Sequence, residues 1–224
     1  MMTTRPMFPG WVRGWHWMNA ALFVTLAVTG FSLHFAGAGA APVSFRLAVL
    51  THNLAGALLA LNYFVYVAIL IFTGEWRQYA VRLHGIVGRL RVQAAYYLGG
   101  IARGEPHPFH ATPERRFNPL QQLTYAATMF VGFPVLAITG LFMLFPETAP
   151  ERVAGIGGVW PMAVLHTLLA YCFVAFLAMH VYLALTCSEP HSGLRAMITG
   201  GAIAEPNVGP TRVPEIDNHV LETD

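Results

Sequence analysis

Residues 164–186 read VLHTLLAYCFVAFLAMHVYLALT, an almost continuous apolar stretch that contains His166 and His180. About twenty apolar residues are enough for a helix to cross a bilayer. Helical geometry places these two histidines about 21 Å apart along the axis and about 40° from a common face. Because an ionisable side chain inside a membrane span is costly, the pair predicts two functional sites stacked at different depths.

The composition is that of an integral membrane protein. Hydrophobic residues make up 55% of the chain and charged residues 11%, whereas about a quarter of a soluble domain is charged. The apolar stretches predict an all-α, four-helix transmembrane bundle with spans at 15–35, 47–72, 120–145 and 161–187. Residues 1–188 then form one membrane domain, with a connection at 74–118, and residues 189–224 form a polar tail that we expect to be extended or poorly ordered.

The first apolar stretch resembles a secretory signal because the Ala-rich segment at 37–41 contains an A-x-A pattern. Its apolar core is longer than the 7–15 residues usual for a signal peptide, and it contains histidine and tryptophan. We therefore predict a retained membrane span.

Arginine placement predicts the orientation. Eleven of the thirteen basic residues lie in the amino-terminal arm, the 74–118 connection and the tail, whereas the two short turns contain Arg46 and Arg152. The positive-inside rule then puts both termini and the connection in the cytoplasm. The resemblance described below implies a bacterial cytoplasmic (inner) membrane. Residues 76–101 mix arginines with apolar side chains, as expected of an amphipathic helix at the interface.

This orientation sorts four histidines by depth. His16 and His180 fall near the cytoplasmic face, and His52 and His166 near the outer face. Each pair can supply two axial nitrogens to a haem iron between helices, which predicts two haems. His34 is the alternative to His52, but it lies about 27 Å from the level of His16, at or beyond the outer interface.

Other features limit the alternatives. The sequence contains no C-x-x-C-H motif, which excludes covalently attached c-type haem. Cys172 and Cys187 are too far apart on one helix to form a disulfide. Arg13 and Arg46 are candidates to pair with haem propionates. Each intramembrane histidine could instead be a hydrogen-bonded packing residue.

Several motifs resemble those of one group of membrane proteins: RGWHWMN at 13–19, Thr29-Gly30, His52 followed by Gly56, NPLQQ at 118–122, and the spacing from His166 to His180. Together they resemble the di-haem cytochrome b membrane subunits of formate dehydrogenase, thiosulfate reductase and nickel–iron hydrogenase. The dipeptide Thr139-Gly140 repeats Thr29-Gly30 at a similar place in the third span, which is compatible with an ancient duplication of a helix pair.

The resemblance implies two haem b groups with the pairing given above. It also implies a menaquinone or ubiquinone site near the cytoplasmic-side haem, at Asn118 and Gln121, whose amides can hydrogen-bond a quinone carbonyl. Asn118 has an alternative role as the cap of the third span. A catalytic subunit with an iron–sulfur, molybdenum or nickel–iron centre would dock on the outer face, and the complex could form a higher oligomer.

We therefore expect the membrane anchor and electron-transfer subunit of a quinone-linked respiratory oxidoreductase. No catalytic residue and no nucleic-acid partner are predicted. One alternative is a self-contained, quinone-linked cytochrome b that acts on a small diffusible substrate such as superoxide. A proton-relay transporter is a second.

Overall fold

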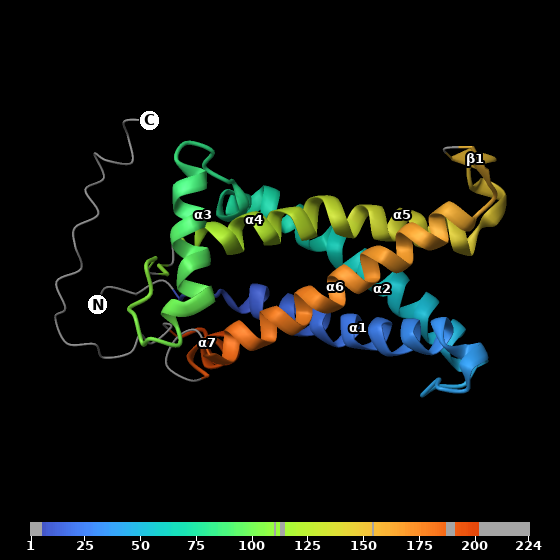
Figure 1. The fold of residues 1–224 in the computed structure, drawn as a ribbon, viewed down its shortest axis with the longest axis horizontal. Coiled ribbons are helices and arrows are strands. Elements are labelled where there is room, and N and C mark those ends of the chain that lie inside the picture. Colours follow the sequence, from blue (N-terminus) through green and yellow to red (C-terminus); the bar gives the residue numbers. More distant parts are fainter. Residues whose placement is uncertain (1–5, 110, 113–114, 154, 187–190, 202–224) are drawn as a thin grey trace. The chain divides into compact units, whose positions relative to one another are not determined.

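The computed structural model describes residues 6–109, 111–112, 115–153, 155–186 and 191–201. It contains four helices long and apolar enough to cross a membrane: α1 (Gly10–His34), α2 (Phe45–Thr73), the continuous stretch 119–144, and α6 (Trp160–Thr186) (Figure 1). The stretch 119–144 consists of α4 (Pro119–Ala127), the π-helix η4 (Thr128–Gly132) and α5 (Phe133–Leu144). The predicted all-α architecture with four spans is confirmed, although the first helix begins at Gly10, five residues before the predicted start of that span.

The described chain forms two compact units. The first contains residues 6–10, 76–127 and 179–201, and the second contains residues 11–75, 128–153 and 155–178. The second unit therefore holds most of the four long helices. It also holds two short elements between α5 and α6, the 3-10 turn η5 (Pro146–Thr148) and the antiparallel pair β1 (Arg152–Val153) and β2 (Ile156–Gly157). A further 3-10 turn, η1 (Ala36–Ala38), follows α1.

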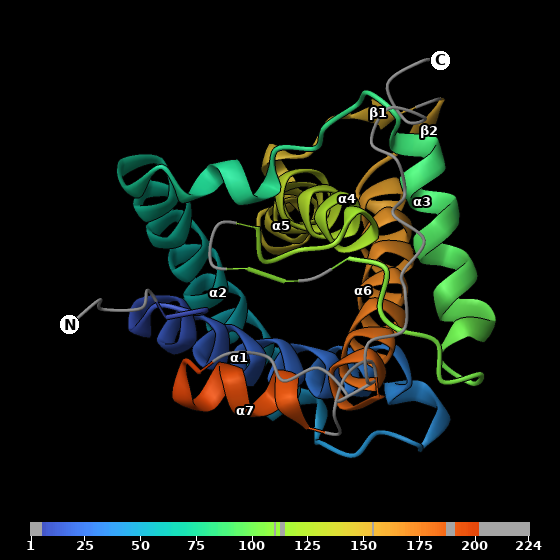
Figure 2. The same ribbon diagram turned by 90° about the vertical axis from the view of Figure 1, so that its left-hand side faces the viewer.

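Aromatic pairs join the helices of the second unit, where α1, α2, α5 and the first part of α6 run side by side (Figures 1 and 2). Trp15 of α1 stacks on Tyr66 of α2 with ring centroids 3.6 Å apart. Tyr63 of α2 packs on Phe133 of α5 at 4.6 Å. Such pairs add about 0.5–1.5 kcal/mol each beyond the area that they bury.

The outward faces of these helices are apolar. Phe72 is 89% exposed and Phe64 is 67% exposed, as suits side chains whose solvent is lipid. The buried positions are often small, as at Ala48 and Ala55 of α2. Small residues at helix contacts allow close approach, and in a membrane this close packing takes over much of the role that the hydrophobic effect has in water.

The first unit contains α3 (Ile86–Ala95), the π-helix η3 (Tyr96–Gly100), α4 and α7 (Ser192–Thr199). The single amphipathic helix predicted at 76–101 is interrupted: the 3-10 turn η2 (Glu75–Tyr79) ends well before α3 begins. Gly85 causes part of this break, because its φ of 63° is left-handed and cannot continue a right-handed helix.

The expectation of an extended tail is wrong over Ser192–Thr199. These residues form α7, which buries Ala196 and ends at Gly200 in the left-handed conformation, with φ 82°. Because the surrounding sequence contains glycines and prolines, its composition did not predict this short helix. Packing stabilises it. Cys187 and the rest of the tail beyond residue 201 lie outside the described residues.

Pro134 is the second residue after the π-helix η4. Proline has no N–H to donate to the carbonyl four residues earlier. A single π-turn just before it shifts the hydrogen-bond pattern to five-residue spacing, which is a common way to accommodate such a break within a long helix. The sequence predicted a kink at this proline, and the structure shows a π-turn beside it.

Asn118 and Gln121 form a reciprocal cap at the start of α4. The Gln121 N–H donates to Asn118 Oδ1 at 2.9 Å, and the Asn118 N–H donates to Gln121 Oε1 at 3.2 Å. The Asn118 amide also donates to the Tyr97 hydroxyl at 2.8 Å, which ties α4 to η3. The capping alternative is therefore seen directly, while the quinone role of these two residues stays a prediction.

Replacing Asn118 tests the cap. Asn118→Ala removes the acceptor of an otherwise unpaired helix N–H, so we expect the protein to lose about 1–2 kcal/mol of stability. For a domain of this size that lowers the melting temperature by roughly 2–8 °C. Asn118→Asp keeps the acceptor and should melt close to the wild type; equal melting of Asn118→Ala and wild type would show that the cap contributes nothing.

Candidate functional site

His52 and His166 face each other inside the second unit. His52 lies in the second turn of α2 and His166 in the second turn of α6, and their ring centroids are 6.4 Å apart. Two imidazoles on opposite sides of one metal ion, each bonded at about 2 Å, have centroids roughly 6 Å apart. The two histidines that the sequence pairs by depth are thus brought together at a spacing that suits axial ligation.

The hydroxyl of Thr29 fixes the tautomer of His52. Thr29 Oγ1 donates its only proton to the carbonyl of Thr25 at 2.7 Å, and it lies 2.9 Å from His52 Nδ1. With its proton already engaged, the hydroxyl accepts from Nδ1, so Nδ1 carries the proton. His52 Nε2 is then the unprotonated nitrogen, which is the form that binds a metal.

His166 repeats this arrangement against α5. Its Nδ1 lies 3.1 Å from Thr139 Oγ1 and 3.0 Å from the Leu136 carbonyl oxygen. A carbonyl oxygen can only accept, so Nδ1 is protonated here too. The Thr139 hydroxyl has its own acceptors, the carbonyls of Val135 and Leu136 at 2.9 Å. His166 Nε2 is therefore also the nitrogen with a free lone pair.

Glycine follows each threonine and gives the imidazole room. A Cβ added at Gly30 would lie 3.4 Å from His52 Cε1, and one added at Gly140 would lie 3.2 Å from His166 Cε1. The ring can therefore lie against the backbone of the neighbouring helix. In each helix pair, the Thr-Gly dipeptide supports one imidazole: the threonine contacts its Nδ1 and the glycine leaves room for the ring. The sequence indicated this relation only as a weak repeat.

His16 and His180 belong to different units and are described separately. His16 lies in the second turn of α1, half-buried, with its ring edge-on to Trp17 at 5.2 Å. In the first unit, His180 Nδ1 lies 3.3 Å from the hydroxyl oxygen of Tyr125 on α4. Tyr125 is a neighbour that sequence reasoning did not identify. The pairing of His16 with His180 stays a prediction.

Buried donors near His16 suit a carboxylate. Trp15 Nε1 and Asn62 Nδ2 are buried and have no hydrogen-bond partner among the described residues. Trp15 stacks on Tyr66, one helical turn beyond Asn62 on α2, so both donors lie in the same part of the second unit. Unsatisfied buried N–H groups are rare in proteins, and the haem propionates are carboxylates that could accept from them.

The two arginines proposed for propionates differ in position. Arg13 lies half-buried in the first turn of α1, and Arg46 is exposed in the first turn of α2. Their role toward a propionate stays a prediction. Trp15 and Asn62 have a stronger structural case than Arg46, because their donors are buried without a partner.

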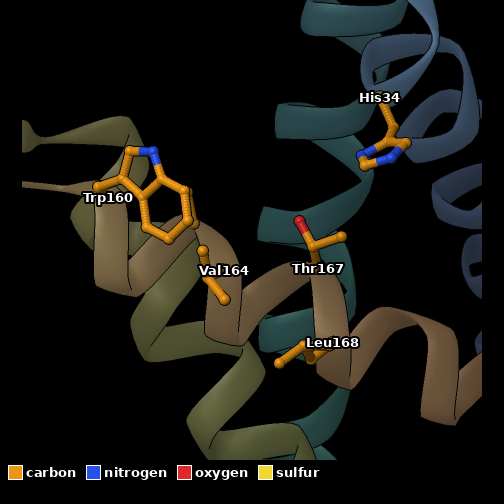
Figure 3. Close-up of a pocket in the computed structure, with 6 residues that line it drawn as sticks. His34, Trp160, Val164, Thr167 and Leu168 are labelled. Atoms are coloured by element: carbon orange, nitrogen blue, oxygen red, sulfur yellow. The ribbon is translucent and has the colours of Figure 1, made fainter.

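His34 is the predicted alternative to His52 as a ligand. It is the last residue of α1, exposed, with its ring 4.7 Å from that of Phe35 and 5.9 Å from that of Tyr171. It lines a cavity of about 290 Å³ whose other walls come from α6 (Figure 3); they are Trp160, Ala163, Val164, Thr167 and Leu168. No group of three or more His, Cys, Asp or Glu side chains that could hold a metal occurs among the described residues, which leaves the facing pair of imidazoles as the candidate metal site.

Thr29→Val and Thr139→Val test the tautomer control. Thr29→Val removes the hydroxyl acceptor of the His52 N–H without changing side-chain volume, so we expect haem affinity at this site to fall roughly tenfold. Thr139→Val should lower it less, because the Leu136 carbonyl still accepts from His166 Nδ1. The midpoint potential of that haem should also move, because hydrogen bonding at the axial ligand tunes it. Haem titration and redox potentiometry measure the two effects. Thr29→Ser should restore both.

Thr73→Val is the matched control, since in the described part of the chain its hydroxyl donates to the Ile69 carbonyl of its own helix. An equal effect of Thr29→Val and Thr73→Val would exclude a specific role for the histidine contact.

Comparison with known proteins identifies the family of the chain. A family model described as prokaryotic cytochrome b561 matches residues 7–200, a range that contains all four long helices and all four histidines. "Putative cytochrome YdhU" of Escherichia coli (strain K12) is 38% identical over 189 residues, which cover 84% of this chain and 71% of that protein.

These findings confirm the expected resemblance at the level of membrane cytochromes of the b type, and with it a multi-pass location in the bacterial inner membrane. Members of this family bind haem b and transfer electrons within the membrane. The apolar helices, the facing imidazoles and the match over nearly the whole chain agree, and the chain belongs to the prokaryotic cytochrome b561 family.

Proposed function

We propose that this chain is the di-haem membrane anchor and electron-transfer subunit of a respiratory oxidoreductase, passing electrons between a redox partner on the outer face and the quinone pool. The observation that carries the proposal is the His52–His166 pair, with both Nδ1 protons engaged by threonine hydroxyls. Both Nε2 atoms are thereby left available to one iron. A haem b held by such a pair supplies a carrier that accepts and donates one electron at a time.

A second pair at another depth follows from position along the helices. His16 is the seventh residue of α1, and His180 is the seventh from the end of α6. We therefore propose that each lies about 9 Å inside the face that the arginine counts predict to be cytoplasmic. His52 and His166 occupy the corresponding depth below the outer face. Two levels of ligands across one bilayer support an electron path that spans it.

The quinone site is proposed at the cytoplasmic end of the third span. Asn118 and Gln121 lie there, and the nearby side chains of Gln93 and Gln122 are buried polar groups. Asn118 is engaged in the cap and with Tyr97. In this proposal it holds Gln121 in position to bind the quinone, and it also contacts the quinone ring. Menaquinone and ubiquinone both present the carbonyls that these amides can bind.

The outer end offers the surface for a catalytic partner. The turns between α5 and α6 expose apolar side chains, with Trp160 67% exposed and Ile156 54% exposed. An iron–sulfur, molybdenum or nickel–iron protein that docks here would lie next to His166, the second turn of α6. Moving one charge across the membrane is worth about 2.3 kcal/mol per 100 mV, so an electron path with this orientation can conserve energy.

The alternative is a self-contained cytochrome that reacts with a small diffusible substrate such as superoxide. The exposed position of His34 and its cavity near the outer end of the bundle are the features that favour it. A histidine proton-relay transporter does not fit a family whose members bind haem b.

Single histidine replacements test the ligand assignment. We expect haem content to fall from about two to about one per chain in His52→Ala, His166→Ala, His16→Ala and His180→Ala, because an iron that loses one axial ligand is bound weakly. Pyridine haemochrome assay of the purified protein measures this. His34→Ala is the control and should keep two haems. Loss of haem in His34→Ala with full content in His52→Ala would overturn the outer pair.

Purification in mild detergent tests the partner. We expect a second polypeptide with an iron–sulfur, molybdenum or nickel–iron centre to co-purify with a tagged chain. Quinone-linked oxidoreductase activity should require this second polypeptide. If the isolated chain oxidises superoxide with quinone as acceptor and no second polypeptide is present, the self-contained alternative is correct.

A further inference from the structure

A cavity of about 290 Å³ in the second unit is not used by the proposed electron path. One wall is His34, the last residue of α1, and the other wall comes from the start of α6 (Figure 3). The α6 residues are Trp160, Ala163, Val164, Thr167 and Leu168. Arginine counts predict that this end of the bundle is the outer one. Ligand pockets start at about 300 Å³, so the cavity has room for one small ring system.

The cavity lies on a different face of α6 from the candidate metal site. At about 100° per residue, the α6 residues that line it share one face, centred roughly 130° around the helix from His166. His166 itself faces α5, where its Nδ1 lies 3.1 Å from Thr139 Oγ1. The cavity is therefore separate from the space between the two facing imidazoles, although its residue Thr167 directly follows His166 in the chain.

The Thr167 hydroxyl forms no hydrogen bond with another described residue. Other threonines of the long helices donate to the carbonyl four residues earlier, as Thr73 and Thr186 do. In Figure 3 the Thr167 hydroxyl points instead toward the space between the rings of Trp160 and His34. A polar group that faces lipid without a partner is costly, so this hydroxyl favours a ligand with an oxygen atom at this position.

The imidazole of His34 is the second polar group of the cavity. Within the described chain it makes ring contacts only, with Phe35 at 4.7 Å and Tyr171 at 5.9 Å between ring centroids. A neutral imidazole has one N–H donor and one acceptor nitrogen. Together with the Thr167 hydroxyl, it can donate to a carbonyl oxygen or accept from a ring hydroxyl.

The rest of the wall is apolar and reaches the surface of the bundle. Ala163 and Val164 line the cavity beside Trp160, which is 67% exposed, and Leu168, which is 57% exposed. A ligand can therefore place a flat ring against the indole and extend an apolar tail into the lipid. A small anion such as superoxide would leave this apolar wall uncovered.

We propose that this cavity binds the head group of an isoprenoid quinone or quinol, as a second quinone site at the outer end of the bundle. His34 and Thr167 hydrogen-bond an oxygen of the ring, and Trp160 packs against the ring face. The site is additional to the one proposed at Asn118 and Gln121. It rests on the proposed function only in taking a quinone as the substrate.

Photo-crosslinking tests the site directly. The full-length, haem-loaded protein in lipid nanodiscs is illuminated with short-chain ubiquinone and menaquinone that carry an azide, and mass spectrometry of the peptides locates the adducts. We expect adducts in residues 160–171 as well as in residues 117–125. Adducts confined to 117–125 would overturn the outer site and leave the proposed function standing. Adducts in 160–171 alone would support the outer site and count against the inner one, and adducts in neither segment would overturn both.

Two substitutions test the hydrogen bonds. Thr167→Val keeps the side-chain volume, and His34→Phe keeps an aromatic ring of similar size. In each variant the quinone concentration that half-saturates labelling of 160–171 should rise about threefold to tenfold, because one hydrogen bond is lost. Labelling of 117–125 should not change, which shows that the variant is folded.

Thr186→Val is the matched control on the same helix, since its hydroxyl donates to the Tyr182 carbonyl. It should label 160–171 like the wild type. Unchanged labelling of 160–171 in both Thr167→Val and His34→Phe would overturn the proposal. Loss of a haem in His34→Phe would also overturn it, because His34 would then be an iron ligand. If His34→Phe does not fold, Thr167→Val alone decides the outcome.

Discussion

The hydrogen bond from a histidine Nδ1–H to a threonine hydroxyl is the interaction on which the functional site depends. In a membrane helix, a threonine hydroxyl donates to the carbonyl of the preceding turn, as Thr29 and Thr139 do. Only its lone pairs then remain for a neighbour, so the neighbouring imidazole must donate. This constraint leaves Nε2 of His52 and His166 unprotonated and aimed away from the supporting helix. The backbone of one helix thus sets the protonation state of a side chain on another.

The same constraint explains the glycines. An imidazole that donates to a hydroxyl on an adjacent helix must lie close to that helix, and a Cβ at Gly30 or Gly140 would press on it. The Thr-Gly dipeptide is therefore one structural unit, used once against α2 and once against α6. Its repetition gives each half of the outer site the same support, which suits a symmetric ligand pair for one metal.

The two ends of the chain's membrane domain differ in character. The outer end has short turns with exposed apolar side chains, which supports the proposed contact with a redox partner. The 74–118 connection contains a capped helix start and buried amides. These polar groups are held by fixed backbone contacts, which supports the proposed quinone site on that side.

The sequence by itself determined the membrane class and the four spans, because these follow from apolar length. It also predicted the orientation, the depth of each histidine and the preference for His52 over His34, from arginine counts and helical rise. Only the tertiary structure decided which side chains meet: the threonine contacts, the orphaned donors of Trp15 and Asn62, and the Tyr125 neighbour of His180. These contacts depend on how each helix is rotated about its axis and on the angles at which the helices cross. The sequence of a uniformly apolar helix does not indicate which of its faces points inward. The helix at Ser192–Thr199 escaped prediction for a related reason, since packing stabilises it more than its own composition does.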